Sequence, residues 1–312
     1  MGDLLKNRVA VVTGAGNGLG RAEAIGLAEH GASVVVNDIG AAVDGTGTSG
    51  GPADKAVAEI KQKGGTAVPS YDSVATEEGA ERIIRTAVDN FGRIDILVNN
   101  AGFTRDRMVY NIPGDEWDDI IKTNLYGTFY CTRNACRIMR AQRYGRIINT
   151  SSHSGLGNMG QASYSAAKEG IVGFTRTVAY DMGRYNVTCN AIRPVAGTRG
   201  IQEMIKEKGL KDNWARLWGE EKAERRVRQM LELNRAEDVA SLVVYLATEA
   251  AGNVNGNVFE VWHGHIGIYV QMPLPEQVLW KDGTWTPEEL VEAMPETLTR
   301  DRVREREPFF PF

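Results

Sequence analysis

Cysteine is scarce in this chain of 312 residues, which holds only Cys131, Cys136 and Cys189. An odd number of cysteines without Cys-x-x-Cys spacing is not typical of a disulfide framework or of a zinc site. The pair His263 and His265 brackets one glycine and has no third ligand nearby in the sequence, so we expect a structural role for it and no metal. Reduced thiols in the core indicate a cytoplasmic protein.

Long apolar runs are also absent. No stretch of eighteen apolar residues occurs, so a membrane-spanning helix is not expected. Residues 1–8 lack the apolar segment of a signal peptide. The 36 basic and 40 acidic residues give a net charge of -4, which provides no attraction for nucleic acid or for a membrane surface. The expected partner is therefore a small molecule.

Short β-branched runs alternate with longer helical patterns through most of the chain. This alternation predicts βαβ units with right-handed crossovers, and so an α/β fold with a doubly wound parallel sheet of the Rossmann type. We expect a single domain over residues 1–267. Its strands are expected at Arg8–Thr13, Ser33–Asn37, Thr66–Ser70, Ile94–Asn99, Arg146–Thr150, Thr188–Arg193 and Asn257–Val261. Its helices are expected from the first turn to about His30, over 53–63, 76–91 and 115–143, from about Ala162, and over 237–248.

Two segments interrupt the alternation. Residues 40–52 are rich in Gly, Ser and Thr and predict a surface insertion. Residues 197–235 are charged and helical, and form either an amphipathic pair of surface helices or a helical lid over a substrate pocket. We favour the lid because the segment breaks the βα pattern and carries large apolar side chains, namely Met204, Trp214, Leu217, Trp218 and Met230.

Residues 268–312 form a C-terminal extension rich in Pro, Trp and charge. Thr286 precedes Pro287, as is typical of a helix N-cap followed by proline at the first helical position. The apolar terminal segment 308–312 is expected to be buried, for example against a neighbouring subunit.

A glycine-rich turn lies between the first strand and the first helix. Gly14, Gly18 and Gly20 give the spacing Gly-x-x-x-Gly-x-Gly, with Leu19 where a Gly-x-Gly-x-x-Gly pattern has its third glycine. A turn without Cβ atoms at a helix N-terminus lets the backbone approach a pyrophosphate. The turn therefore predicts a dinucleotide site.

Asp38 ends the second strand, eighteen residues after Gly20. A carboxylate in this place accepts hydrogen bonds from the adenosine ribose hydroxyls and repels a 2′-phosphate. The positions at which a basic residue would favour NADP hold Asn17 and Ile39, so NAD is the expected cofactor. Asp72 and Ser73, just after the third strand, are candidates for contact with adenine.

Tyr164 and Lys168 are four residues apart, and Ser151 lies thirteen residues before Tyr164. On a helix, side chains at this spacing share one face and are about 6 Å apart along the axis. An ammonium there favours the phenolate and lowers a phenol pKa that starts near ~10. The pair therefore predicts proton transfer.

Together these residues resemble the short-chain dehydrogenase/reductase family over roughly residues 6–266. The resemblance rests on Thr13–Gly20, Asn99–Gly102, Asn124, Ser151, Tyr164 and Lys168. It is stronger for one branch, the (3R)-hydroxyacyl-CoA dehydrogenase or 17β-hydroxysteroid dehydrogenase unit of peroxisomal multifunctional enzyme type 2. The segments that carry this branch are 36–40, 71–74, 104–107, 144–147 and 160–168.

The resemblance implies a role for each catalytic residue. Tyr164 would be the general acid and base that exchanges a proton with the substrate oxygen. Lys168 would lower the pKa of Tyr164 and hold the nicotinamide ribose. Ser151 would donate a hydrogen bond to the carbonyl or alkoxide oxygen, and Asn124 would position a water in a proton relay to Lys168. Ser152 competes for the serine role, but the spacing of thirteen residues selects Ser151.

The resemblance also implies the cofactor contacts. Residues 100–102 would line the adenosine and ribose. After the sixth strand the chain has Pro-Val-Ala-Gly-Thr where the family commonly has Pro-Gly, so either Val195 or Thr198 would meet the carboxamide. The expected cofactor-binding set is Gly14, Asn17, Gly18, Leu19, Gly20, Asp38, Asp72, Ser73, Asn100, Ala101, Gly102, Tyr164, Lys168, Pro194, Val195 and Thr198.

The expected function is an NAD-dependent oxidoreductase that interconverts a secondary alcohol and a ketone. A (3R)-3-hydroxyacyl-CoA is the preferred substrate, and a hydroxysteroid or another bulky cyclic alcohol is the alternative. A non-catalytic NAD-sensing protein is a hypothesis of another class, but a sensor would not need Tyr164. The family implies a homodimer or homotetramer formed through the helices at 115–143 and around Tyr164.

Overall fold

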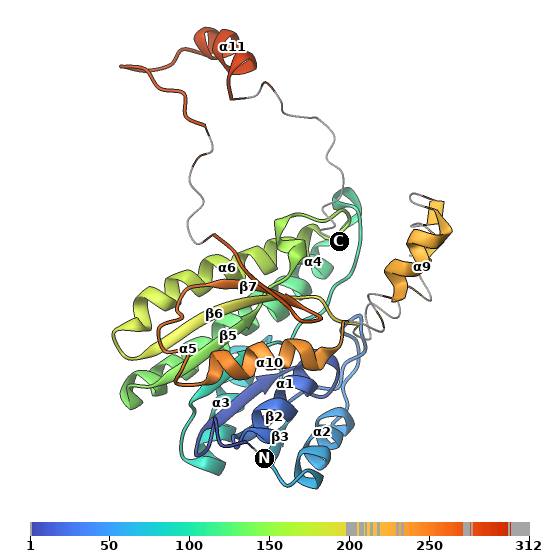
Figure 1. The fold of residues 1–312 in the computed structure, drawn as a ribbon, viewed down its shortest axis with the longest axis vertical. Coiled ribbons are helices and arrows are strands. Elements are labelled where there is room, and N and C mark those ends of the chain that lie inside the picture. The colour runs from blue at the N-terminus through green and yellow to red at the C-terminus, as the bar shows by residue number, and fades with distance from the viewer. Residues whose placement is uncertain are drawn as a thin grey trace. The chain divides into compact units, whose positions relative to one another are not determined.

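The computed structural model describes residues 2–197, 205, 209, 211–212, 215–216, 219–228, 231, 234–270, 275, 277–298 and 300. The chain divides into two compact units, Met1–Tyr269 and Val270–Phe312 (Figure 1). The first unit ends two residues after the boundary expected from the sequence, because a short last strand still belongs to its sheet.

The first unit is built on one sheet of eight strands in the order β3-β2-β1-β4-β5-β6-β7-β8. Strands β1 to β7 are parallel and β8 is antiparallel to β7. The order reverses between β1 and β4, which is where doubly wound sheets bind ligands. The expected α/β fold is confirmed. The strands are β1 (Val9–Thr13), β2 (Ser33–Asn37), β3 (Thr66–Ser70), β4 (Ile96–Asn99), β5 (Gly145–Thr150), β6 (Val187–Pro194), β7 (Val258–Trp262) and β8 (His265–Ile268).

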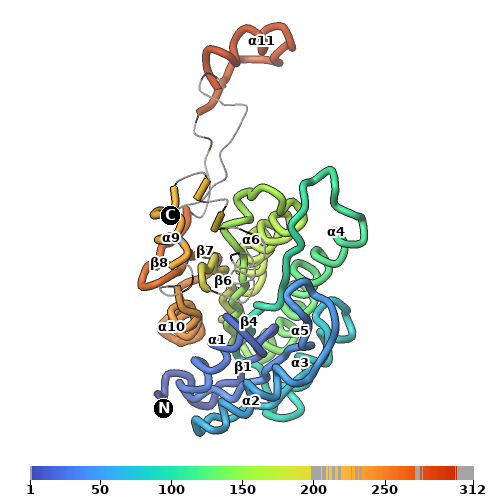
Figure 2. Tube along the Cα trace, turned by 90° about the vertical axis from the view of Figure 1, so that its right-hand side faces the viewer, coloured from blue at the N-terminus to red at the C-terminus, as the bar shows by residue number. Residues whose placement is uncertain are grey.

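Helices cover both faces of the sheet, and the sheet lies between them in Figure 2. Helices α1 (Gly18–Glu29), α2 (Gly51–Gln62) and α10 (Ala236–Ala247) pack on one face around one apolar cluster. Helices α3 (Glu77–Phe91), α5 (Gly127–Gln142) and α6 (Ala162–Gly183) pack on the other face around a second cluster. Because both faces are covered, β1 and β4 consist wholly of buried residues.

The helix expected over 115–143 is interrupted. Helix α4 (Gly114–Ile121) passes into the π-helical turn η2 (Lys122–Tyr126) before α5 begins. A π-turn widens the helix by one residue and is frequent at functional sites. Here it carries Asn124, whose carbonyl accepts a hydrogen bond from the Thr128 hydroxyl at 2.7 Å.

The segment 40–50 forms the expected insertion between β2 and α2, closed by a hydrogen bond from the Ser49 N–H to the Ile39 carbonyl. The five apolar residues that suggested a lid lie outside the described residues, as does 308–312. Within the described part of the lid segment, residues Glu220–Arg228 form helix α9.

In the second unit, helix α11 (Pro287–Glu296) begins as expected. The Thr286 hydroxyl accepts a hydrogen bond from the Glu289 N–H, and the Glu289 carboxylate accepts one from the Thr286 N–H. This reciprocal capping box confirms the predicted helix start.

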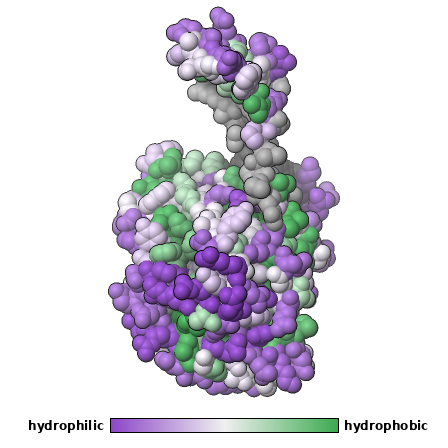
Figure 3. All heavy atoms as spheres, turned by 90° about the vertical axis from the view of Figure 1, so that its left-hand side faces the viewer, coloured by the Kyte–Doolittle hydropathy of each residue, from purple (hydrophilic) through white to green (hydrophobic). Residues whose placement is uncertain are grey.

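The surface of the molecule is mixed. On the face shown in Figure 3 hydrophilic residues predominate and hydrophobic ones occur in separate patches. Among the described residues no helix is long and apolar enough to cross a membrane.

Candidate functional site

The glycine turn between β1 and α1 has a conformation that requires glycine. Gly14 and Gly18 have positive φ angles of 63° and 54°. A Cβ on Gly14 would lie 2.8 Å from the Ala101 Cα, and one on Gly20 would collide with the Gly14 carbonyl. The turn thus presents bare backbone at the N-terminus of α1, which fits a pyrophosphate. The Leu19 side chain packs against the core instead.

Asp38 lies beside this turn at the end of β2. Its Oδ2 accepts a hydrogen bond from the Gly16 N–H at 2.8 Å, and its Oδ1 accepts one from the Gly40 N–H at 2.6 Å. A Cβ on Gly16 would lie 2.8 Å from Asp38 Oδ2. Two backbone donors therefore fix a negative charge next to the candidate pyrophosphate site.

The two candidates after β3 have local partners. The Asp72 carboxylate accepts a hydrogen bond from Arg82 Nε at 2.6 Å, and the Asp72 carbonyl accepts one from Asn37 Nδ2 at 2.9 Å. The Ser73 hydroxyl accepts one from the Ala75 N–H at 3.2 Å. Their contact with adenine stays a prediction.

Residues 100–102 follow β4 and are clamped to the end of β1. Asn100 Nδ2 donates to the carbonyls of Thr13 and Gly14, each at 3.0 Å. The N–H groups of Asn100 and Ala101 both donate to the Thr13 hydroxyl at 3.1 Å. Thr13 is a positioning residue that the sequence did not reveal, because nothing but its place at a strand end distinguishes it.

Asn124 and Lys168 converge on Gly102. A Cβ on Gly102 would overlap Asn124 Oδ1 and lie 3.5 Å from Lys168 Nζ. Asn124 is fully buried, and its amide donates to the carbonyls of Phe103 and Ile120, each at 3.0 Å. Its Oδ1 is a buried acceptor that meets no donor in the described structure. A buried amide oxygen needs a donor, and the water expected between Asn124 and Lys168 would supply one.

Lys168 is 3% exposed, and its Nζ donates to the Thr150 carbonyl at 2.7 Å. Burial lowers the pKa of Lys168 to about 7. Burial also raises the pKa of Tyr164 to about 12, although a hydrogen bond with the Ser152 side chain opposes this. Lys168 was expected to lower the pKa of Tyr164, but these two side chains by themselves do not produce that shift. Burial favours the neutral form of both groups. The ammonium lies 5.4 Å from the centre of the tyrosine ring.

The structure contradicts the choice of Ser151. Its side chain is buried, and its hydroxyl donates to the Lys168 carbonyl at 2.8 Å. Ser152, and not Ser151, is the serine whose side chain acts on Tyr164 and opposes the rise of its pKa. Neighbouring side chains at a strand end point in opposite directions, so only one of two adjacent serines can face Tyr164. A count of thirteen residues along a loop does not decide which one, because loop length varies.

Ser152 also caps a short helical turn. Its hydroxyl oxygen accepts a hydrogen bond from the Ser154 N–H at 3.1 Å at the start of the 3₁₀ turn η3 (His153–Leu156). This contact uses the Ser152 oxygen as an acceptor, so the hydroxyl proton of Ser152 is left for Tyr164 or for a substrate oxygen beside it.

Of the residues expected to lie near the carboxamide, Pro194 and Val195 are among the described residues. Pro194 ends β6, and the Val195 N–H donates to the Val261 carbonyl at 3.0 Å. The N–H of Val195 is thus engaged within the protein. Thr198 lies outside the described residues.

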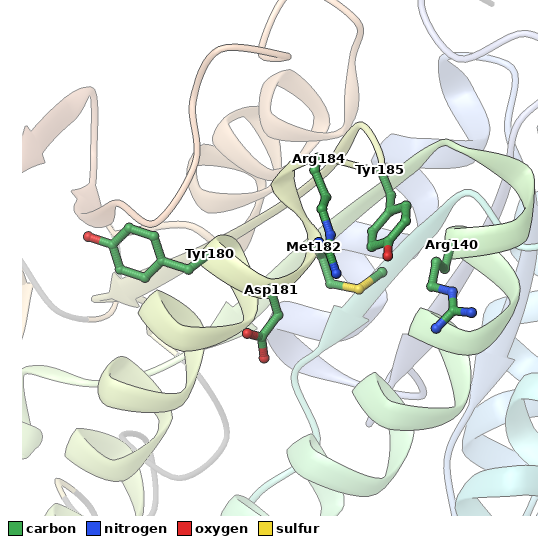
Figure 4. Close-up of a pocket in the computed structure, with 6 residues that line it drawn as sticks. All are labelled: Arg140, Tyr180, Asp181, Met182, Arg184 and Tyr185. Carbon is green, nitrogen blue, oxygen red and sulfur yellow. The ribbon is translucent and has the colours of Figure 1, made fainter.

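A surface pocket lies far from these residues. It is lined by Arg140 from α5, by residues 180–182 at the end of α6 and by residues 184–185 just after it, and Figure 4 shows Asp181, Met182 and Tyr185 around it. Tyr164 is in the first turn of α6, eighteen residues before Met182, which is roughly 27 Å along the helix axis. The pocket is therefore separate from the candidate active site.

Comparison with known proteins places these features in a family. A sequence model of the family described as short chain dehydrogenase matches residues 8–208. The chain is 46% identical over 261 residues to the Mus musculus protein named peroxisomal multifunctional enzyme type 2, across 83% of this chain and 32% of that protein. This chain therefore spans about a third of that relative's length.

Two further similarities extend over nearly the whole chain. The Mycobacterium tuberculosis protein named hydroxyacyl-CoA dehydrogenase ChsB1 is 38% identical over 319 residues, across 97% of this chain and 91% of that protein. The crystal structure of a short chain dehydrogenase from Mycobacterium avium superposes with a TM-score of 0.79 at 39% identity, across 98% of both chains.

Proposed function

Because the chain belongs to the short-chain dehydrogenase family, we propose that it interconverts a (3R)-3-hydroxyacyl-CoA and its 3-oxo form with NAD. The family resemblance expected from the sequence motifs is confirmed. Oxidoreductases of this family act on a CH–OH group with a nicotinamide cofactor. Membership of the family therefore argues against the hypothesis of a non-catalytic NAD-sensing protein. We propose NAD as the cofactor, a CoA thioester as the substrate and the (3R) configuration at its hydroxyl-bearing carbon.

The observation that carries the proposal is the convergence of four polar side chains at the carboxyl ends of β4 and β5. The Ser152 side chain acts on Tyr164, Lys168 Nζ lies 5.4 Å from the centre of the Tyr164 ring, and Asn124 and Lys168 meet beside Gly102. This arrangement suits proton transfer to and from a substrate oxygen.

In this mechanism Tyr164 accepts the proton of the substrate hydroxyl during oxidation and returns it during reduction. The Ser152 hydroxyl donates a hydrogen bond to the same oxygen, because its own oxygen already accepts from the Ser154 N–H. Lys168 exchanges protons with a water held by Asn124 Oδ1. Bound NAD would accept the hydride from the carbinol carbon, and its positive ring would favour the phenolate of Tyr164.

The preference for NAD rests on Asp38. Its carboxylate is fixed by the N–H groups of Gly16 and Gly40 at 2.8 and 2.6 Å. A 2′-phosphate at the end of β2 would bring two or more negative charges together, whereas ribose hydroxyls donate hydrogen bonds to a carboxylate. These contacts favour NAD over NADP.

The substrate class rests on the relatives. The M. tuberculosis relative, similar over nearly the full length of both chains, is named as a hydroxyacyl-CoA dehydrogenase. We also propose a cytoplasmic homodimer or homotetramer, formed through α4, α5 and α6. Exposed aromatic rings on this part of the surface, Tyr126 at 45% and Phe129 at 38%, support association there.

The test is NADH absorbance with a panel of (3R)- and (3S)-3-hydroxyacyl-CoAs, hydroxysteroids and simple secondary alcohols. The proposal expects the highest kcat/KM for a (3R)-3-hydroxyacyl-CoA. A higher kcat/KM for a hydroxysteroid than for every thioester would make the substrate assignment wrong. The sedimentation behaviour of the same protein tests the oligomeric state, and a monomer would contradict it.

A further inference from the structure

The hairpin of β7 and β8 carries an acidic residue, Glu260, that contacts the residue after Ser152. Glu260 of β7 pairs with Gly267 of β8. A Cβ on Gly267 would lie 2.7 Å from Glu260 Oε1, so glycine at this position leaves room for the carboxylate. On its other side Glu260 pairs with Arg193, one residue before the end of β6.

The Glu260 carboxylate joins three side chains. Its Oε2 lies 3.2 Å from His153 Nε2 and accepts a hydrogen bond from the Tyr269 hydroxyl at 3.1 Å. Its Oε1 lies 2.9 Å from His265 Nε2. Burial alone would raise the pKa of Glu260, but the hydrogen bonds from these partners hold it below its ordinary value. The indole of Trp262 stacks on the His265 ring at 3.9 Å and fixes that side.

His153 connects this cluster to the catalytic serine. It directly follows Ser152 and opens the turn η3 that Ser152 caps. Its side chain is only 12% exposed, and burial lowers its pKa although Glu260 opposes the shift. A neutral imidazole near pH 7 then donates its Nε2–H to the carboxylate, which makes the contact a directed tether.

A second set of contacts reaches the middle of η3. Arg193, the partner of Glu260 across β6 and β7, lies 4.8 Å over the Tyr269 ring and donates to Glu169 at 2.7 Å. A Cβ on Gly155 would lie 2.7 Å from Glu169 Oε2. The turn η3 is thus held at its start by Glu260 and packed near its middle against Glu169.

We propose that Glu260 is a positioning residue for the reaction, which holds His153 and thereby fixes the direction of the Ser152 hydroxyl toward the substrate oxygen. This inference rests on the proposed function. Glu260 itself touches neither substrate nor cofactor in this account. It acts by limiting the rotation and displacement of η3, and the antiparallel hairpin supplies the rigid support.

The first test is the variant Glu260→Gln, which keeps the size of the side chain and removes its charge. We expect kcat to fall by about 10- to 100-fold, since a displacement of about 1 Å at a reacting group can cost up to 100-fold. The KM and the dissociation constant for NAD should stay within about twofold, because the glycine turn is untouched. The control is Glu29→Gln, which removes an exposed ion pair between Glu29 at the end of α1 and Lys63 just after α2 and should leave kcat unchanged.

A double-mutant cycle separates positioning from a general loss of structure. If Glu260 acts through Ser152, Glu260→Gln should cost nothing further in a Ser152→Ala background. Losses that add fully in the double variant would overturn the proposal. So would an unchanged kcat in a folded Glu260→Gln protein.

A readout without turnover distinguishes failure of this inference from failure of the proposed function. The chain has only 4 histidines, so ¹³C-labelled histidine resonances can be assigned with a His153→Gln variant. Removal of the Glu260 charge should lower the pKa of His153 further, because the carboxylate favours the imidazolium. A His153 titration that is identical in Glu260→Gln would refute the tether, whatever substrate the enzyme uses.

Discussion

Replacing Ser152 by alanine should harm catalysis far more than replacing Ser151. The Ser152 side chain acts on Tyr164, and the Ser152 oxygen accepts a hydrogen bond from the Ser154 N–H at 3.1 Å. The Ser151 hydroxyl is buried and donates to the Lys168 carbonyl at 2.8 Å. The two variants remove the same atom from adjacent residues, so each is the control of the other.

The magnitudes differ because the two hydroxyls act on different states. Removal of a donor aimed at the developing oxyanion costs about 100- to 1,000-fold in kcat, or about 3–4 kcal/mol. Ser152→Ala should show a loss of this size. Loss of the Ser151 hydrogen bond leaves a carbonyl with one partner fewer and should cost about 1 kcal/mol of folding free energy, with kcat changed by less than about threefold.

The assay is steady-state NADH formation under saturating NAD, combined with urea denaturation of each variant. Ser152→Ala should keep the wild-type free energy of unfolding within about 1 kcal/mol and lose turnover. A large loss of kcat in Ser151→Ala together with an active Ser152→Ala would refute the assignment and restore the count of thirteen residues.

Three other outcomes follow from single residues. Asp38→Asn should raise kcat/KM with NADP at least about tenfold, since one charge repulsion worth about 1.4 kcal/mol is removed; unchanged cofactor preference in NADH and NADPH assays would contradict the role of Asp38. Gly102→Ala should lower kcat, because its Cβ would overlap Asn124 Oδ1, while NAD affinity measured by calorimetry should fall less than kcat. Burial raises the pKa of Glu23 from 4.5 to about 8, so the folded chain keeps a proton that the unfolded chain releases. The free energy of unfolding should therefore fall by about 1.4 kcal/mol per pH unit as the pH rises from 4.5 to about 8. Urea titrations across that window should show this slope in the wild type and its loss in Glu23→Met; equal slopes would contradict it.

The fold was accessible from the sequence because its strands are short β-branched runs separated by helical patterns of adequate length. Strand β8 was missed because His265–Ile268 has four residues, contains Gly267 and follows β7 after a two-residue turn. The π-turn around Asn124 was missed because a change from i+4 to i+5 hydrogen bonds has no sequence signature.

The site was accessible where backbone geometry demands one residue type. Gly14 and Gly20 occupy positions where a Cβ cannot fit, so their spacing in the sequence indicates the turn. The choice between Ser151 and Ser152 depends on which side of a strand end faces α6, and spacing along a loop does not encode it. The partners of Glu260 are spread from His153 to Tyr269, so only the folded chain brings them together.

The most direct test of the central claim is the variant Tyr164→Phe, assayed with NAD and a (3R)-3-hydroxyacyl-CoA. The variant removes one oxygen from the residue of α6 on which the Ser152 side chain acts and leaves the glycine turn intact. We expect NAD binding measured by calorimetry to persist within about twofold while turnover falls by at least about 100-fold, because a general acid and base is lost. Turnover of Tyr164→Phe close to that of the wild type would contradict the role of Tyr164 as the general acid and base.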